Sequence, residues 1–283
     1  MAAATWSASS KSRTGRSAAY RTLSVDVGAP CTNRGKSRRS AFVEAALNRV
    51  QLIESDRSTM AEARWTEVDR YIDEVFALSD AALDSVLEAS AAAGLPSINV
   101  SPSQGKLLFV LAKAMGASRV LEVGTLGGYS TIWLARALPR DGRLVTIELD
   151  VTHADVARAN FARAGLADCI DLRVGSALDV LPQLASEGQT PFDLIFIDAD
   201  KESYPAYLAW SIKLARVGTL ILADNVVRNG AVVEADSDDP KVQAVRRFNA
   251  ELAADPRVSA TEIQTVGVKG YDGFAAIVVT NDQ

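Results

Sequence analysis

Between residues 119 and 224, five short and continuously apolar segments alternate with segments of helical periodicity. Apolar segments without alternating polar residues are typical of parallel strands whose sheet is covered by helices on both faces. The chain is therefore expected to fold as a doubly wound α/β domain with a mostly parallel sheet. The expected strands are residues 119–124, 143–149, 170–175, 192–198 and 219–224.

Two more strands are expected near the carboxyl end of the chain, at residues 259–266 and 274–280, which brings the sheet to seven strands. A glycine-rich loop joins these two, so they need not run parallel to the others. On the amino-terminal side, Ser101-Pro102 has the form of a helix N-cap followed by proline at the first helical position. It predicts a helix that extends to about Met115.

Residues 60–96 are expected to form helices that pack on the core or on a partner subunit. Ser79-Asp80 separates two apolar helical faces and is suited to end one helix and cap the next. Residues 1–59 are rich in Ser, Arg and Ala, lack apolar periodicity, and are expected to be a disordered or weakly structured extension. Two alternatives stay open for this extension, namely an organelle targeting segment or a translation start at Met60.

The composition limits the possible sites and partners. Two cysteines, Cys31 and Cys169, and one histidine, His153, are too few for a disulfide framework, a zinc site or a multi-histidine metal site. Any metal would therefore need oxygen ligands, and a reducing, cytoplasmic location fits. Residues 1–59 carry ten basic and four acidic side chains and the remainder 20 and 31, so no nucleic-acid partner is expected. No apolar run approaches the ~18 residues of a membrane-spanning helix, so no membrane partner is expected.

The first two expected strands end in acids. Glu122 is followed by Gly124 and by a Gly-Gly pair, which allow a ligand to approach the backbone and the next helix to offer free N–H groups. The spacing is not the G-x-G-x-x-G of dinucleotide sites, and an acid here repels a pyrophosphate but suits an ammonium group. S-adenosylmethionine carries an ammonium group and no phosphate. Glu148 ends the second strand, where an acid can bridge the two hydroxyls of a ribose, although it can equally be a solvated carboxylate.

Acidic and amide side chains also follow the fourth and fifth expected strands. Asp198 and Asp200 end the fourth strand, and Asp224 and Asn225 end the fifth. If these strands are neighbours, Asp198, Asp224 and Asn225 converge at one edge of the sheet. Such oxygen ligands suit a hard divalent cation with positions left for water or substrate. The alternative is that they only end strands and cap helices.

Four segments in unbroken order closely resemble the cation-dependent O-methyltransferases, the family of the caffeoyl-CoA and catechol O-methyltransferases. The resemblance covers residues from about 98 to 281, and its most specific parts are D-A-D-K and D-N followed by R-N-G-A-V-V. It implies a class I, Rossmann-like methyltransferase domain over residues 97–283. It also implies S-adenosylmethionine as cofactor and a divalent cation, Mg²⁺ ahead of Ca²⁺ or Mn²⁺. The segments are LEVGTLGGYS, VTIELD, IFIDADKESY and ADNVVRNGAVV.

The resemblance implies roles for individual residues as well. Asp198, Asp224 and Asn225 match the metal ligands, and Lys201 matches the lysine proposed as general base. Glu122 matches the residue that binds the methionine ammonium. Further cofactor contacts are implied for Gly124, Thr125 and Ser130 around the amino-acid part, for Glu148 at the ribose and Ala177 at the adenine, for Val100, and for Asp198 and Asp200.

The implied reaction is in-line transfer of the sulfonium methyl group to a hydroxyl of a phenolic small molecule, most simply a catechol. A cation bound to two neighbouring oxygens of the acceptor would lower the phenol pKa. Lys201, with Asp198 the candidate catalytic pair, would remove the remaining proton if its own pKa is lowered. The alternative for Lys201 is a salt bridge to Asp198 or Asp200.

Two segments depart from the family pattern, residues 232–240 and the GVKGYDGFA sequence before the last strand. Both are expected to border the substrate, so the acceptor need not be a plant thioester. The resemblance also suggests a homodimer that uses the helices at 63–92. Two other functions stay open, a nicotinamide-dependent oxidoreductase on a similar sheet and a non-catalytic cofactor-binding module.

Overall fold

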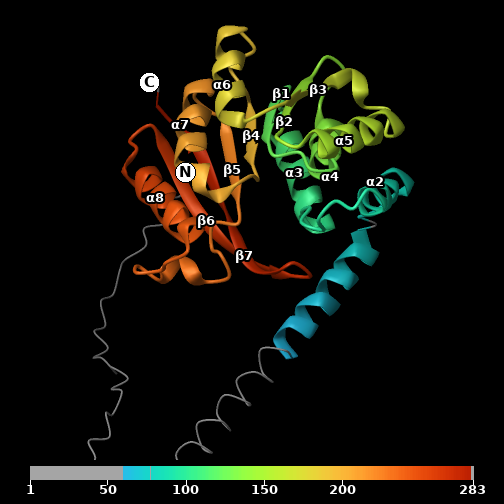
Figure 1. Cartoon of the computed structure of the whole chain (residues 1–283), viewed down its shortest axis with the longest axis horizontal. Coiled ribbons are helices and arrows are strands. Elements are labelled where there is room, and N and C mark those ends of the chain that lie inside the picture. Colours follow the sequence, from blue (N-terminus) through green and yellow to red (C-terminus); the bar gives the residue numbers. More distant parts are fainter. Residues whose placement is uncertain (1–59, 77, 282–283) are drawn as a thin grey trace, which may run out of the picture. The chain divides into compact units, whose positions relative to one another are not determined.

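The computed structural model describes residues 60–76 and 78–281, so the expectations for residues 1–59 lie outside the described residues. The described chain is built on one seven-stranded sheet in the order β3-β2-β1-β4-β5-β7-β6 (Figure 1). The pairs among β1 to β5 are parallel, and β7 is antiparallel to both β5 and β6. The predicted doubly wound, mostly parallel fold is confirmed. The strands are β1 (Arg119–Val123), β2 (Arg143–Glu148), β3 (Ile170–Val174), β4 (Leu194–Ile197), β5 (Leu220–Asp224), β6 (Val258–Gly267) and β7 (Gly270–Val279).

Both helix starts expected from capping residues are present. The Asp80 carboxylate accepts hydrogen bonds from the N–H groups of Ala82 and Leu83, and Ser101 forms a reciprocal capping box with Gln104. A further helix spans residues 60–76. The α-helices after it are α2 (Ala81–Ala92), α3 (Pro102–Ala114), α4 (Tyr129–Ala137), α5 (Val151–Arg163), α6 (Ala177–Ser186), α7 (Tyr204–Leu214) and α8 (Pro240–Ala254), with 3-10 helices η1 (Ala167–Cys169), η2 (Lys201–Ser203) and η3 (Ala231–Val233).

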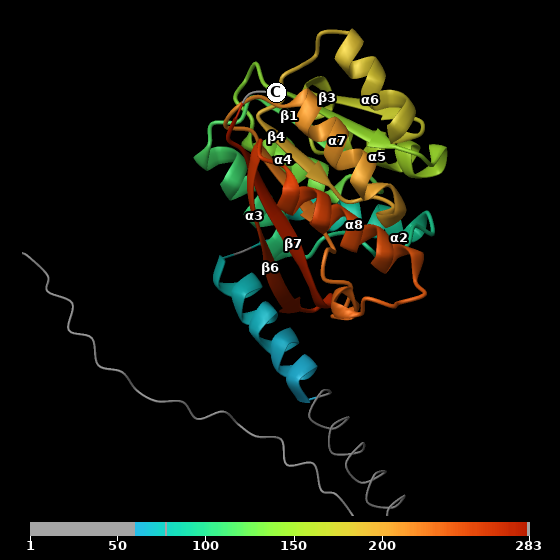
Figure 2. The same cartoon turned by 90° about the vertical axis from the view of Figure 1, so that its left-hand side faces the viewer.

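Two hydrophobic layers cover the two faces of the sheet, because alternate residues of each strand point to opposite faces. In β1, Leu121 and Val123 pack with α6, α7 and α8, whereas Val120 packs with α2, α3, α4 and α5. Figures 1 and 2 show α6, α7 and α8 together on one face of the sheet. No described helix is long and apolar enough to cross a membrane. The sheet is thus buried on both sides, and its strand ends are free to form a site.

Helix α8 is absent from the sequence expectations, which treated residues 232–240 only as a departure from the family. The start of this helix could nevertheless have been predicted from the sequence, because Asp239 is followed by Pro240. In the structure, the Asp239 carboxylate caps the helix by accepting the Lys241 N–H. The buried residues Val242, Val245 and Phe248 then recur at helical spacing.

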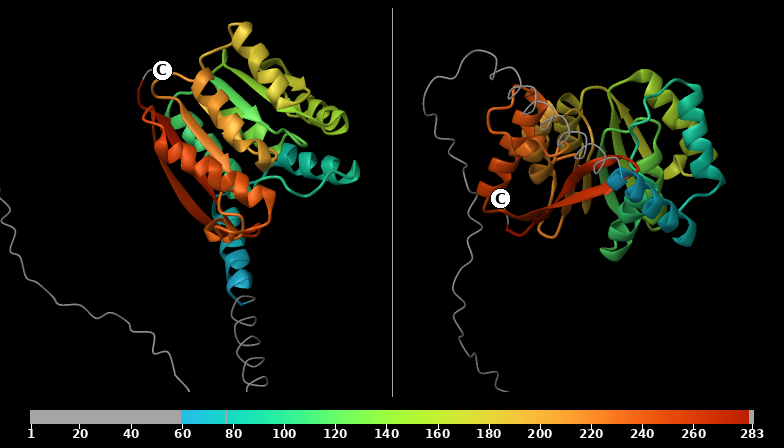
Figure 3. Two further views of the ribbon diagram at one scale, coloured as in Figure 1. Left: turned by 60° about the vertical axis from the view of Figure 1, so that its left-hand side comes forward. Right: turned by 90° about the horizontal axis from the view of Figure 1, so that it is seen from below.

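The prediction of a glycine-rich loop between the last two strands is wrong. Strands β6 and β7 run ten residues each, and a two-residue turn at Val268 and Lys269 joins them. The hairpin tip lies beside helix 60–76, where the Val268 N–H donates to the Asp69 carboxylate at 2.6 Å (Figure 3). Most of GVKGYDGFA is therefore paired strand, and its first residues lie where the hairpin meets an amino-terminal helix.

Candidate active site

The end of β1 is in close contact with the end of β4. Gly124 has a φ of 99°, and a Cβ atom at this position would lie 2.0 Å from the carbonyl oxygen of Asp198. Only glycine fits a backbone that is both left-handed and this close to another strand. Gly124 is therefore required by the close packing of β1 against β4, and its contact with a cofactor stays a prediction.

Glu122 is enclosed by three hydroxyl groups. Ser130 and Thr146 each donate to its carboxylate at 2.7 Å, and Thr131 donates as well. The residue is fully buried. Burial raises the pKa of the Glu122 carboxyl from its ordinary value of 4.5 to about 7, although the three hydroxyl donors lower it. The structure brings Glu122 and Ser130 together as predicted, with Thr131 and Thr146 as partners that the sequence did not identify.

Glu148, at the end of β2, faces the same turn. Its carboxylate accepts hydrogen bonds from the N–H groups of Thr125 at 3.2 Å, Leu126 at 2.7 Å and Asp150 at 2.9 Å. His153 on α5 places its Nδ1 atom 3.6 Å from this carboxylate. Glu148 is thus a buried and oriented acid rather than a freely solvated one.

The other predicted cofactor residues lie on neighbouring segments. Val100 is buried just before α3, and Ala177 begins α6 after β3. Asp200 is exposed, and its carboxylate accepts hydrogen bonds from the Ser203 N–H at 3.1 Å and from the Tyr207 hydroxyl. Their contact with a cofactor stays a prediction.

Asp198 and Asp224 meet at adjacent strand ends. Strands β4 and β5 pair in parallel with Ile197 opposite Ala223, so the next residue of each chain segment is one of the two acids. Burial and the nearby Asp198 charge raise the pKa of the Asp224 carboxyl to about 7. Asn225 follows in the left-handed region, at φ 57°, with its N–H 2.8 Å from the Asp224 carboxylate. The condition set by the sequence, that these strands are neighbours, is met.

Lys201 is buried beside these acids. Its Nζ atom lies 3.1 Å from the Asp198 carboxylate and 2.6 Å from the Tyr204 hydroxyl. Tyr204 is fully buried and donates to the Asp224 carbonyl at 2.8 Å. The ion pair with Asp198, one of the two sequence alternatives for Lys201, is present. Its role as a base stays a prediction.

This donor set fits a hard divalent cation. Two carboxylates and an amide oxygen are ligands that Mg²⁺ and Ca²⁺ prefer, and the mutual repulsion of Asp198 and Asp224 is relieved by positive charge between them. No group of three His, Cys, Asp or Glu side chains is arranged as a metal site within residues 60–76 and 78–281. The proposed set differs from such a group because its third member is an amide.

A pocket of about 460 Å³ opens beside Asp224 and Asn225. This volume is within the range of small-molecule sites. The start of α3, the loop after β5 and the tip of the β6–β7 hairpin form its walls. Residues 232–240 do not line it, whereas the hairpin segment does. Its lining includes Asp69, Ile98, Val100, Leu107, Arg228, Val266, Val268, Lys269, Asp272 and Phe274.

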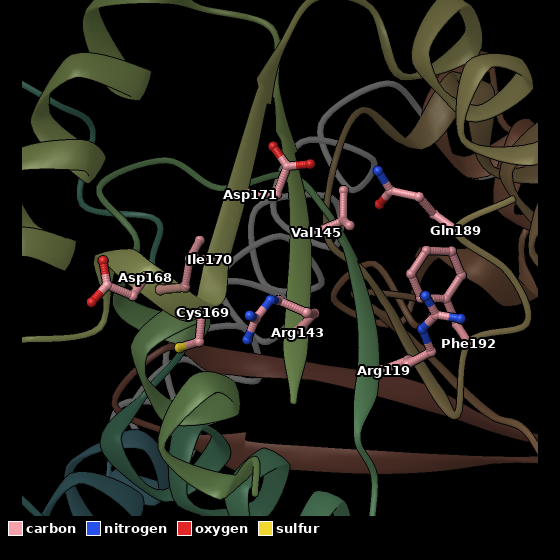
Figure 4. Close-up of a pocket in the computed structure, with 9 residues that line it drawn as sticks. All are labelled: Arg119, Arg143, Val145, Asp168, Cys169, Ile170, Asp171, Gln189 and Phe192. Atoms are coloured by element: carbon pink, nitrogen blue, oxygen red, sulfur yellow. The ribbon is translucent and has the colours of Figure 1, made fainter. Parts of the chain in front are cut away.

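A second pocket, of about 330 Å³, lies at the amino-terminal ends of the strands (Figure 4). It is lined by Arg119, Arg143 and Ile170, the first residues of β1, β2 and β3. Ligands of open α/β sheets bind at the carboxyl ends of the strands, and none of the predicted site residues lines this pocket. The candidate active site is therefore the pocket at Asp224 and Asn225.

Besides Thr131 and Thr146, two residues that support this site were missed by the sequence reasoning. The Asp272 carboxylate on β7 accepts hydrogen bonds from the N–H groups of Val227 at 3.0 Å and Arg228 at 2.9 Å, and so holds the loop after β5. Tyr204 connects Lys201 to the end of β5. The spacing of Lys201 and Tyr204 could have signalled one shared helical face, but nothing local connects Asp272 to a loop 44 residues earlier.

Comparison with known proteins gives a consistent result. A family model described as O-methyltransferase matches residues 73–273. A catechol O-methyltransferase of Niastella koreensis is 53% identical over 212 residues, which covers 75% of this chain and 96% of that protein.

Solved structures agree with this match. An O-methyltransferase from Bacillus cereus in complex with SAH is 55% identical, with a TM-score of 0.76, and covers 77% of this chain and 99% of that one. An O-methyltransferase from Streptomyces achromogenes in complex with SAM is 49% identical, with a TM-score of 0.76, and covers 78% of this chain and 99% of that one.

Proposed function

Because this chain belongs to the O-methyltransferase family and is an S-adenosylmethionine-dependent transferase, we propose that it methylates a hydroxyl of a catechol-like acceptor with the help of a divalent cation. Membership of the O-methyltransferase family excludes the two alternatives, a nicotinamide-dependent oxidoreductase and a non-catalytic cofactor-binding module. What remains to be proposed is the metal, the acceptor class and the role of each site residue.

The observation that supports the proposal is that β4 and β5 are neighbours, so Asp198, Asp224 and Asn225 lie at adjacent strand ends. The two strands pair in parallel with Ile197 opposite Ala223, and the next residue of each is one of the two acids. Asp224 and Asn225 also line the 460 Å³ pocket. A cation site that opens into a small-molecule pocket suits an acceptor with two neighbouring oxygens.

Each site residue has its own proposed role in the methyl transfer. When bound, the cation lowers the pKa of the acceptor hydroxyl. Lys201, held between Asp198 and Tyr204, is the proposed general base. Its ammonium must first release a proton to solvent, and the neutral amine then receives the phenolic proton. Glu122 and Glu148 orient the ammonium and ribose groups of S-adenosylmethionine. The segment around Val100 excludes water from the reacting groups. Methyl transfer mainly requires that the acceptor oxygen and the sulfonium methyl group are aligned. Mg²⁺ is the proposed cation, with Ca²⁺ or Mn²⁺ as alternatives.

The test is methyl transfer from S-adenosylmethionine to catechol, with Mg²⁺ and then with excess chelator. Product is expected with Mg²⁺, and its formation is expected to fall at least about 100-fold with chelator because the phenol loses its Lewis acid. Product is measured by mass spectrometry, and cofactor binding is measured separately by calorimetry. Undiminished product in chelator would refute the cation requirement, whereas cofactor binding without product from any catechol would refute the acceptor class.

We also propose a homodimer that uses helix 60–76. Val68, Tyr71, Val75 and Phe76 on this helix are exposed, and a contiguous apolar surface of this kind is costly in water. Sedimentation is expected to give a dimer mass, and Phe76→Glu is expected to shift it toward the monomer. Glu67→Gln, on the same helix and also exposed, is the control. A wild-type monomer at micromolar concentration would contradict the dimer. A cytoplasmic location is also proposed, because the two cysteines, Cys31 and Cys169, are far apart in the sequence and suit a reducing environment.

A further inference from the structure

Arg228 is a cation of the acceptor pocket that has no ion-pair partner among the residues that the structure describes. It lies three residues after Asn225 and lines the same pocket. Its side chain is half-buried, and its Nε atom is enclosed without a hydrogen-bond partner. Across residues 60–76 and 78–281, no carboxylate forms an ion pair with its guanidinium. An enclosed charged donor without an acceptor costs free energy, so this arrangement favours an anion that comes from outside the chain.

The backbone holds Arg228 in a strained conformation. Arg228 and the next residue, Asn229, both have φ 55°, in the left-handed region that residues with a side chain rarely adopt. The Asp272 carboxylate stabilises this loop through the N–H groups of Val227 and Arg228. Strained backbone that is maintained by dedicated hydrogen bonds is concentrated at functional sites. The loop therefore fixes the backbone from which the Arg228 side chain extends, and Arg228 is one of the residues that line the pocket.

The other charged groups of the pocket agree with an anionic ligand. Lys269 at the hairpin tip is a second cation, and its Nζ atom donates to the Ser97 carbonyl at 3.2 Å. The Asp69 carboxylate accepts the Val268 N–H at 2.6 Å, and the Asp272 carboxylate is used by the loop. Asp224 would belong to the cation. Among the described residues, neither Arg228 nor Lys269 forms an ion pair with a carboxylate, and the Asp272 carboxylate contacts Arg228 only through its backbone N–H.

Apolar side chains form the rest of the pocket wall, namely Ile98, Leu107, Val266 and Phe274. They suit an aromatic ring, whereas a flat neutral catechol would leave the Arg228 guanidinium unpaired. A ligand that satisfies all parts of the wall has two neighbouring hydroxyls at one end, a ring in the middle and a negative charge at the other end.

We propose that the natural acceptor is an aromatic acid, a catechol-type ring with a carboxylate substituent that Arg228 binds. This inference rests on the proposed function, because it assumes that the hydroxyls are held at Asp198, Asp224 and Asn225. Arg228 is then a specificity-determining residue. A guanidinium binds a carboxylate through charge-assisted and often bidentate hydrogen bonds, which a neutral amide cannot match.

The test compares each of two acids with its own neutral amide, namely protocatechuate with its carboxamide and caffeate with its carboxamide. The two acids place the carboxylate at different distances from the hydroxyls. Steady-state kinetics are measured with Mg²⁺ for the wild type, for Arg228→Gln, and for Arg247→Gln as the control. Arg247 is exposed on α8, outside the pocket, and its replacement changes the net charge equally.

For at least one pair, the wild type is expected to prefer the acid, and Arg228→Gln is expected to raise the KM of that acid by about 10- to 100-fold. The kcat for that acid should change less than its KM. The KM of the amide with Arg228→Gln, and the KM of either compound with Arg247→Gln, should change less than about twofold. Equal effects of Arg228→Gln on acid and amide, or no effect on either acid, would overturn the inference while the proposed function stands. Absence of methylation of all four compounds by a wild type that methylates catechol itself would overturn this inference alone. Absence of methylation of catechol as well would overturn the proposed function and this inference with it.

Discussion

Replacement of Asp198 with asparagine is expected to lower kcat/KM for methyl transfer to a catechol by about 10²- to 10³-fold, since a metal Lewis acid contributes several kcal/mol to transition-state stabilisation. The asparagine side chain has nearly the same shape, but it supplies no negative charge for the cation. It also replaces the carboxylate that forms the ion pair with Lys201 at 3.1 Å with a neutral amide. The measurement is initial rate as a function of Mg²⁺ concentration, in which the variant should need more Mg²⁺ for half-maximal activity.

Glu202→Gln is the matched control for this variant. Glu202 lies in η2, one residue after Lys201, and is exposed. Its replacement removes one negative charge from the same segment and is expected to leave the rate unchanged within about twofold, because exposed charges interact weakly. Thermal unfolding of Asp198→Asn should resemble that of the wild type, which separates lost chemistry from lost folding. An Asp198→Asn variant with more than a tenth of wild-type activity would show that Asp198 is not a metal ligand.

Replacement of Glu122 with glutamine is expected to weaken the binding of S-adenosylmethionine about 100-fold at pH 8, because an ammonium group loses a buried charged partner. The affinity of the wild type should also depend on pH. The pKa of the free Glu122 carboxyl is raised to about 7 by burial, and a protonated carboxyl must lose its proton to pair with the ammonium. Below pH 7 the dissociation constant is therefore expected to rise about tenfold per pH unit.

Calorimetric titration of S-adenosylmethionine between pH 5.5 and pH 8.5 (roughly 1.5 units on either side of the Glu122 pKa) checks this expectation. The Glu122→Gln variant should show a much flatter profile. Glu88→Gln, on the exposed side of α2, should behave as the wild type. Equal slopes for the wild type and Glu122→Gln would rule out Glu122 as the titrating partner of the cofactor.

The same carboxyl affects the stability of the cofactor-free protein with a definite sign. Its pKa in the folded state is raised from 4.5 to about 7. Between these values the folded protein holds a proton that the unfolded chain has released, so the free energy of unfolding falls as the pH rises through this window. Glu122→Gln should therefore be more stable than the wild type at pH 8, by about 3 kcal/mol, and similar to it near pH 4.5. This gain would accompany the loss in cofactor affinity.

Much of the fold was determined by the sequence alone. The strands could be predicted because continuous apolar segments have few other uses in a chain of this composition, and the helix starts at Asp80 and Ser101 because their side chains bond to nearby N–H groups. The positions of the acids at strand ends were also local information. Helix α8 was missed although its cap and its apolar spacing were present in the sequence.

The relations between distant segments were decided only by the tertiary structure. That β4 and β5 are neighbours, and so bring Asp198 and Asp224 together, depends on strand order. The use of Asp272 to hold the loop of Arg228 depends on the pairing of β7 with β5. No local pattern encodes either relation.

Protonation behaviour was decided in the same way. The sequence identified Glu122 as an acid at the end of a strand, but its pKa depends on complete burial and on hydroxyl groups from α4 and β2. Burial is a property of the whole packed domain, and electrostatic energies depend on the surroundings that packing creates. The sequence therefore determined which chemical groups this protein has at its strand ends, and the tertiary structure decided which of them are close enough, and buried enough, to act together.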